Sequence, residues 1–130
     1  MAESAAATAA GERPLVDKEN VRNHIAAGFL FFLIAIFAGL FYALQLDGIY
    51  PFKGVELASP GRVRMLHTNA VAYGFLFNLF IAALNWIVPR LTGKPVFNPL
   101  LSKAIFWAWQ LVVLATAVGI IGGPAPGHQR

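Results

Sequence analysis

The sequence predicts an all-α membrane protein with three transmembrane helices. Of its 130 residues, 58% are hydrophobic and 12% are charged, whereas soluble domains carry about 25% charged residues. Its three long apolar runs contain no Asp, Glu, Lys or Arg. Each run has the length needed to cross a hydrocarbon core of ~30 Å at ~1.5 Å per residue.

The membrane region is expected to cover residues 24–123, with spans at about residues 25–44, 65–89 and 104–121. Residues 1–23 are rich in alanine at the start and are expected to be a partly disordered tail. Residues 124–130 form a Gly/Pro-rich C-terminal tail.

The distribution of positive charge predicts the orientation. The N-terminal tail and the second loop hold six of the ten Lys and Arg residues, and the first loop and C-terminal tail hold four. Because positive charge favours the cytoplasmic side, the N-terminus is expected in the cytoplasm.

Composition excludes several classes of function. The net charge is +4, but the basic residues lie at segment ends and do not form the clustered basic face of a nucleic-acid-binding protein. The chain has no cysteine. Disulfides, zinc-thiolate sites, iron–sulfur clusters and covalently attached heme are therefore excluded for this chain.

One ionisable residue, His67, lies inside the second span and follows Arg62 and Arg64. Such a residue is costly in a bilayer and usually has a partner or a function. Histidine supplies a neutral nitrogen to metals, so His67 could be an axial heme ligand with arginines nearby for the propionates. The alternative is a helix-end histidine bound to headgroups or loop carbonyls, with arginines that reach lipid phosphates.

A polar and small-residue stripe accompanies His67 along the second span. On a helical wheel Gly74, Asn78 and Asn85 lie within about 20° of His67. Small residues there leave room for a flat macrocycle or for a close neighbouring helix. For the two asparagines, hydrogen bonds between helices are favoured over cofactor contact.

The first span carries a ridge of small residues, Ala35, Gly39 and Ala43, that suits tight helix packing. His24 precedes this ridge at the cytoplasmic end of the span and is expected at the membrane interface.

Residues 61–71 (GRVRMLHTNAV) resemble the second transmembrane helix of subunit I in the heme–copper oxidases, particularly the cbb-type cytochrome c oxidases. Residues 85–89 and 97–107 are similar to the stretch that links the second and third helices in that superfamily. The resemblance covers roughly residues 21–123.

The resemblance implies a cofactor site. His67 is expected to be an axial ligand of the low-spin heme b, with Arg62 and Arg64 near its propionates on the outer side. Gly74, which the helical wheel places on the same stripe, is assigned to the cofactor site with them. The high-spin heme, the copper and their ligands belong to later helices, so no catalytic residue is expected within this chain.

The resemblance also implies the N-terminal portion of a larger polytopic helical bundle. This bundle is the catalytic subunit of a terminal oxidase that passes electrons from cytochrome c to oxygen and translocates protons. The expected partners are the remaining helices, a c-type cytochrome subunit and the lipid of a bacterial inner membrane; alone, the chain is expected to be inactive.

Three alternatives remain open from the sequence. The chain could be part of a nitric oxide reductase catalytic subunit, whose helix starts with a similar Leu-His-Thr-Asn. It could be a small accessory membrane subunit without a redox center. It could also form a bis-histidyl cytochrome b by dimerisation.

Overall fold

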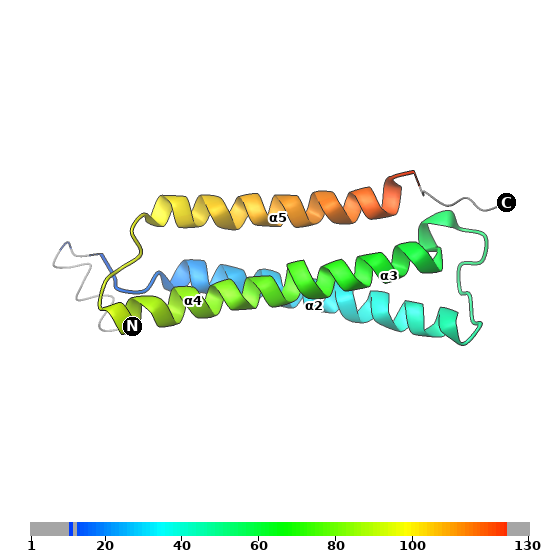
Figure 1. Ribbon diagram of the computed structural model, residues 1–130, viewed down its shortest axis with the longest axis horizontal. Coiled ribbons are helices and arrows are strands. Elements are labelled where there is room, and N and C mark those ends of the chain that lie inside the picture. The colour runs from blue at the N-terminus through cyan, green and yellow to red at the C-terminus, as the bar shows by residue number, and fades with distance from the viewer. Residues whose placement is uncertain (1–10, 12, 125–130) are drawn as a thin grey trace.

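The computed structural model describes residue 11 and residues 13–124, and three helical segments dominate this part of the chain (Figure 1). The first is α2 (Lys18–Leu46) and the last is α5 (Pro99–Gly122). The middle segment runs through α3 (Pro60–Asn69), η2 (Ala70–Leu76) and α4 (Phe77–Thr92), and a short 3₁₀ turn, η1 (Glu56–Ala58), precedes it.

All three segments are long and apolar enough to cross a membrane, with 29, 33 and 24 residues. About 20 residues suffice for the hydrocarbon core, so the helix ends can extend into the headgroup region. The predicted all-α fold with three membrane-spanning helices is confirmed, and the chain is a membrane protein.

Polar side chains cap the first turns of α2 and α5. The Asp17 carboxylate accepts the backbone N–H of Asn20 at 3.0 Å. The Asn98 side chain accepts those of Leu100 and Leu101 at 3.0 and 3.2 Å. These caps satisfy N–H groups that have no partner within the helix, so the sequence itself determines where each helix begins.

The middle segment begins with Pro60. A helix tolerates proline in its first turn, because a backbone N–H there would have no partner within the helix. It ends at Gly93, whose φ of 65° is the left-handed conformation that glycine adopts without steric cost.

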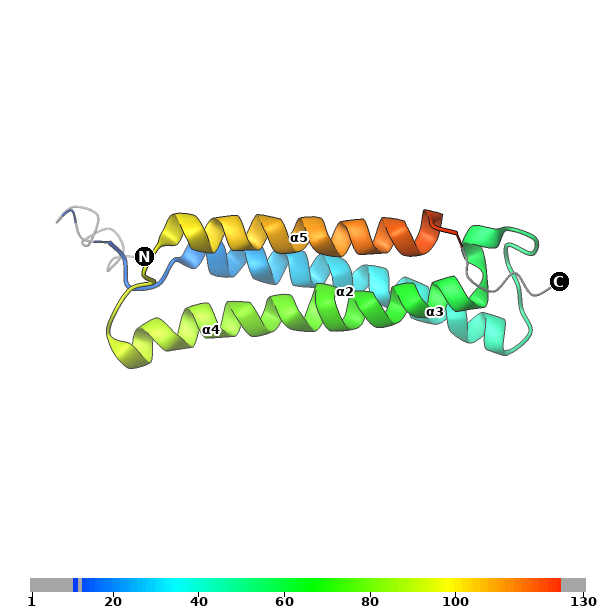
Figure 2. The same cartoon turned by 45° about the horizontal axis from the view of Figure 1, so that its top comes forward.

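The three segments form a bundle in which the middle segment runs antiparallel to α2 and α5 (Figures 1 and 2). The middle segment packs against α2 along its length, and α5 lies beside them. Glycine allows the closest approach. An added Cβ at Gly28 of α2 would lie only 3.2 Å from Cδ2 of Leu79 in α4. Close packing at small residues is the usual way in which membrane helices associate.

The predicted ridge of α2 is used for part of its length. Ala35 is buried and Gly39 packs against the middle segment, whereas Ala43 is exposed. Large apolar side chains such as Phe37 and Leu111 cover the outside of the bundle. In a membrane this outer surface faces lipid or further helices.

The middle segment is not a uniform α-helix. Its central part, η2, is π-helical, and the backbone N–H of Phe77 bonds to the carbonyl of Ala72, five residues earlier. A π-helical turn holds an extra residue and therefore shifts the phase of the helix by about 100°.

This extra residue keeps the buried face straight. Val63, Ala70, Gly74 and Ala82 are buried on the middle segment, and Pro89 is the last residue of that face. Seven turns of α-helix take about 25 residues, one fewer than separate Val63 from Pro89. The π-helical turn absorbs the difference.

Candidate functional site

The imidazole of His67 lies against α2. Its Nδ1 is 2.7 Å from the backbone carbonyl oxygen of Ala35. An added Cβ at Gly39 would lie 2.8 Å from both Nδ1 and Cε1 of the ring, so the glycine makes the space in which the ring fits.

This contact determines the tautomer of the neutral ring. A carbonyl oxygen only accepts hydrogen bonds, so Nδ1 of His67 carries the proton and donates it to Ala35. Nε2 then keeps its lone pair. A histidine that binds a metal through one nitrogen and donates the other N–H to a backbone carbonyl has this arrangement.

The two arginines that precede His67 lie in different environments. Arg62 is buried, and its guanidinium donates to the carbonyl oxygens at the end of α5: Ile120 at 2.6 Å, Ile121 at 2.8 Å and Gly123 at 2.6 Å. It also pairs with Glu56 at 3.2 Å. The structure therefore engages Arg62 as a cap on α5, because the last carbonyls of a helix lack partners within it.

Arg64 lies one turn before His67 and is exposed. Among the residues that the structure describes, its guanidinium has no hydrogen-bond partner. Of the two arginines, Arg64 is the one whose five donors remain available to a carboxylate.

Gly74 is a helix contact. A Cβ added at this position would lie 2.5 Å from Cγ of Phe31 in α2. Of the two interpretations left open by the sequence, a close helix and room for a macrocycle, the structure has the close helix. The space at Gly74 is filled by Phe31, and we no longer assign this glycine to a cofactor.

A buried polar cluster joins all three segments about three turns from His67 along the middle segment. Nδ1 of His24 is 2.9 Å from Oδ1 of Asn78, and the Gln110 amide donates to the same oxygen at 2.7 Å. Asn78 in turn donates to Gln110 at 3.2 Å and to the carbonyl of Gly74 at 2.6 Å. Each segment contributes one side chain, so the cluster links α2, α4 and α5.

His24 is 1% exposed and lies inside the bundle, so its side chain faces the other helices, which its expected position near the membrane interface did not indicate. Asn78 provides the partner that makes the burial of an imidazole tolerable, and Phe106 of α5 packs edge-on against the ring at 4.8 Å. The prediction that Asn78 bonds between helices is confirmed. Asn85 instead donates to the carbonyl of Ile81 in its own helix.

Comparison with known proteins identifies the family. Residues 20–129 match the family described as cytochrome c and quinol oxidase polypeptide I. The chain belongs to this family. The resemblance to the heme–copper oxidase subunit I is thereby confirmed.

Two bacterial oxidase subunits illustrate the relationship. The chain is 37% identical over 90 residues to the cbb3-type cytochrome c oxidase subunit CcoN1 of Stutzerimonas stutzeri, which covers 68% of this chain and 19% of that protein. It is 32% identical over 103 residues to cytochrome c oxidase subunit 1 of Rhodobacter capsulatus, covering 78% and 18%. The chain thus spans about a fifth of the length of these relatives, and no solved structure matches it.

The donor groups at His67 are of the kinds that bind a heme. The ring has Nε2 free of a proton while Nδ1 donates to Ala35, and Arg64, one turn away, has no partner among the described residues. The other two residues assigned from the sequence, Arg62 and Gly74, have protein partners.

Three features escaped the sequence reasoning: the role of Gln110, the burial of His24, and the π-helical turn. The sequence carries a partial signal for the first two, since several polar residues lie in or next to apolar runs: Asn20, His24, Ser102 and Gln110. For the π-helical turn, composition offers only the glycine at position 74 as a signal.

Proposed function

We propose that this chain contributes an axial ligand, His67, to the low-spin heme b of a respiratory terminal oxidase. The bound heme would supply one-electron transfer. The complete catalytic subunit would pass electrons from cytochrome c to oxygen and translocate protons, with the high-spin heme and the copper held by helices beyond this chain.

The observation that carries the proposal is the hydrogen bond between Nδ1 of His67 and the Ala35 carbonyl. It holds the ring in one orientation and leaves Nε2 as the nitrogen with a lone pair. A hydrogen-bonded second nitrogen is the common companion of metal-bound histidine, because it fixes the ring and raises its basicity.

The remaining groups act on the cofactor's surroundings. Arg64 can hold a propionate by paired, charge-assisted hydrogen bonds. The close contact between Gly74 and Phe31 packs the middle segment against α2 two turns after the histidine.

The proposed setting follows from the family and the charge distribution. We propose a bacterial inner membrane, an N-terminus in the cytoplasm, and assembly with the remaining helices and a c-type cytochrome subunit. The relatives carry oxidase names, which favours oxygen over nitric oxide as the substrate.

The first test is His67→Ala in the complete subunit. We expect loss of the low-spin b signal in the reduced-minus-oxidised spectrum, because the neighbouring Thr68 and Asn69 are poor heme ligands. Thr68→Ala is the matched control, since Thr68 is exposed and its hydroxyl only donates to the carbonyl of Arg64. A normal low-spin spectrum in His67→Ala would end the assignment.

A second variant tests the orientation of the ring. Gly39→Ala places a Cβ where the ring of His67 now lies, so the ring must move away from Ala35 and the low-spin spectrum should shift. Gly61→Ala is the control, because its added Cβ meets nothing within 4 Å. Equal spectra in the two alanine variants would contradict the proposed orientation.

A further inference from the structure

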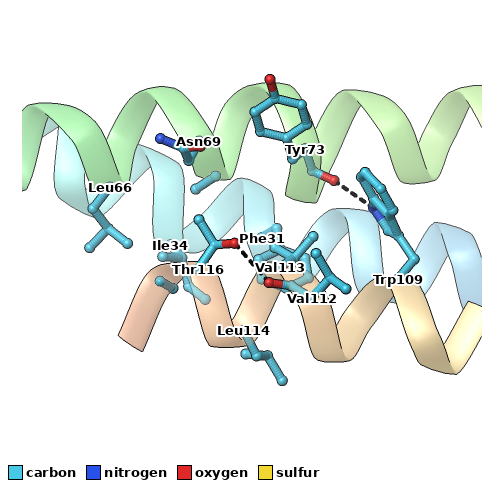
Figure 3. A pocket seen from close by; sticks show the side chains of 12 residues that line it. Phe31, Ile34, Leu66, Asn69, Tyr73, Trp109, Val112, Val113, Leu114 and Thr116 are labelled. Carbon is cyan, nitrogen blue, oxygen red and sulfur yellow. Dashed lines mark hydrogen bonds between the residues drawn. The ribbon is translucent and has the colours of Figure 1, made fainter. Parts of the chain in front are cut away.

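A side chain of α5 donates one hydrogen bond to the backbone of the π-helical turn in the middle segment. Where a π-helical turn returns to α-helix, the backbone ladder skips a carbonyl. The N–H of Phe77 bonds to Ala72, and the next carbonyl along the chain, that of Tyr73, accepts the indole N–H of Trp109 at 3.0 Å. Figure 3 shows this bond between the two helices.

The same tryptophan also packs on the segment. Its ring stacks on Phe77 with centroids 4.0 Å apart and lies 6.3 Å from the ring of Tyr73. Trp109 therefore contacts the end of the π-helical turn through both its donor and its face.

The rest of this side of η2 is poorly packed. A cavity of about 280 Å³ lies between α2, the middle segment and α5, and Asn69, Ala70 and Tyr73 line it together with apolar side chains of α5 (Figure 3). The amide of Asn69 donates to its own helix at Met65, so it gives no bond across the cavity. The cavity leaves part of this side of η2 without a packed side chain, next to the carbonyl that Trp109 binds.

The turn lies between two faces that must both be correctly oriented. His67 lies three residues before η2 begins, and Asn78, which binds His24 and Gln110, lies two residues after η2 ends. If the extra residue were lost from the turn, one face would rotate by about 100° relative to the other. Because the buried cluster anchors Asn78, the rotation or strain would appear at His67.

We propose that Trp109 is a positioning residue for the heme ligand: its indole N–H holds the π-helical turn and so fixes the orientation of His67. Trp109 does not touch the cofactor in this scheme. The inference rests on the proposed function, since the orientation of His67 matters through the iron that it binds.

The test uses the complete oxidase and the electron paramagnetic resonance signal of its oxidised low-spin heme, which reports axial-ligand geometry. Trp109→Phe removes the N–H and keeps an aromatic ring against Phe77; we expect shifted or heterogeneous g values and a shifted midpoint potential. Trp107→Phe is the matched control, because Trp107 is 69% exposed and its indole has no hydrogen-bond partner among the described residues.

Trp109→His retains a ring N–H and is expected to recover a signal closer to that of the wild type. Unchanged g values in Trp109→Phe would overturn the proposal, as would a signal equally altered in Trp109→His or in Trp107→Phe. These failures are distinct from failure of the proposed function, which is read from His67→Ala: loss of the low-spin signal there keeps His67 as the ligand, whatever Trp109 does.

Discussion

Arg62 and Arg64 are separated by one residue, yet they make opposite uses of the same side chain. The side chain of Arg62 is 8% exposed, and its guanidinium donates hydrogen bonds to the end of α5 and pairs with Glu56. Arg64 lies two positions further along the helix and is exposed. The two arginines therefore differ because the C-terminal end of α5 lies beside Arg62, and their neighbours in the sequence do not indicate this difference.

This difference predicts opposite phenotypes for Arg64→Leu and Arg62→Leu in the complete subunit. Loss of a cation beside the macrocycle disfavours the reduced, less positive heme, so Arg64→Leu should lower the midpoint potential by tens of millivolts, at about 40 mV per kcal/mol. Arg62→Leu should leave the potential nearly unchanged and lower the thermal stability of the subunit. Redox titration and a melting curve measure the two effects, and the reverse pattern would show that Arg62 is the propionate ligand.

At the scale of helices, the buried cluster of His24, Asn78 and Gln110 is the main polar link. Apolar packing between membrane helices gains little from the hydrophobic effect, because lipid is as apolar as the side chains. The hydrogen bonds of this cluster form only when the three helices are aligned at one position along their axes. Because Asn78 and His67 belong to the same middle segment, the cluster also fixes the position of that segment along α2 and α5.

Asn78→Leu is therefore expected to destabilise the bundle by roughly 1–2 kcal/mol, since it leaves His24 and Gln110 buried without their partner. Asn85→Leu is the matched control on the same helix: Asn85 donates only to Ile81 of its own helix, so its loss should have little effect. Unfolding in mixed micelles measures both. Equal stabilities would indicate that the cluster is not a structural link.

The sequence predicted the helices well and their internal register less well. Apolar length and caps specify the three spans, and the resemblance around His67 specified its family. The helical wheel placed His67, Gly74 and Asn78 on one stripe, and in the structure all three contact α2. The wheel assumes a constant pitch, so it could not predict the π-helical turn, which Phe31 of α2 and Trp109 of α5 contact.

His24 and Arg62 show the same limit at single positions. A histidine near the end of an apolar run and an arginine before one look interfacial in sequence. Their burial depends on partners 54 and 58 residues away, Asn78 and Ile120. Such pairings are fixed by helix packing and leave no local signal.

The whole molecule is expected to insert with its N-terminus in the cytoplasm, which places Lys94 on the cytoplasmic side and Lys53 on the outer side. The chain has no cysteine, so a single introduced cysteine reports its own location. In sealed inverted vesicles an impermeant maleimide should label Lys94→Cys and spare Lys53→Cys. Labelling of Lys53→Cys alone would establish the inverted topology.

The described residues present one face with Arg64 available and with His67 held by Ala35, and they leave large apolar side chains over the outside of the bundle. This arrangement suits a segment that contributes a single ligand to a cofactor shared with other helices. In the proposed assembly, this chain would set the orientation of one nitrogen, and the other helices of the oxidase would complete the site.

The most direct measurement is an experimental density map of the complete subunit with its cofactors. We predict a heme iron bonded to Nε2 of His67, with Nδ1 of the same ring still donating to the carbonyl of Ala35. A map in which Nε2 of His67 contacts only protein or lipid, and the low-spin heme takes both of its axial ligands from other residues, would contradict it.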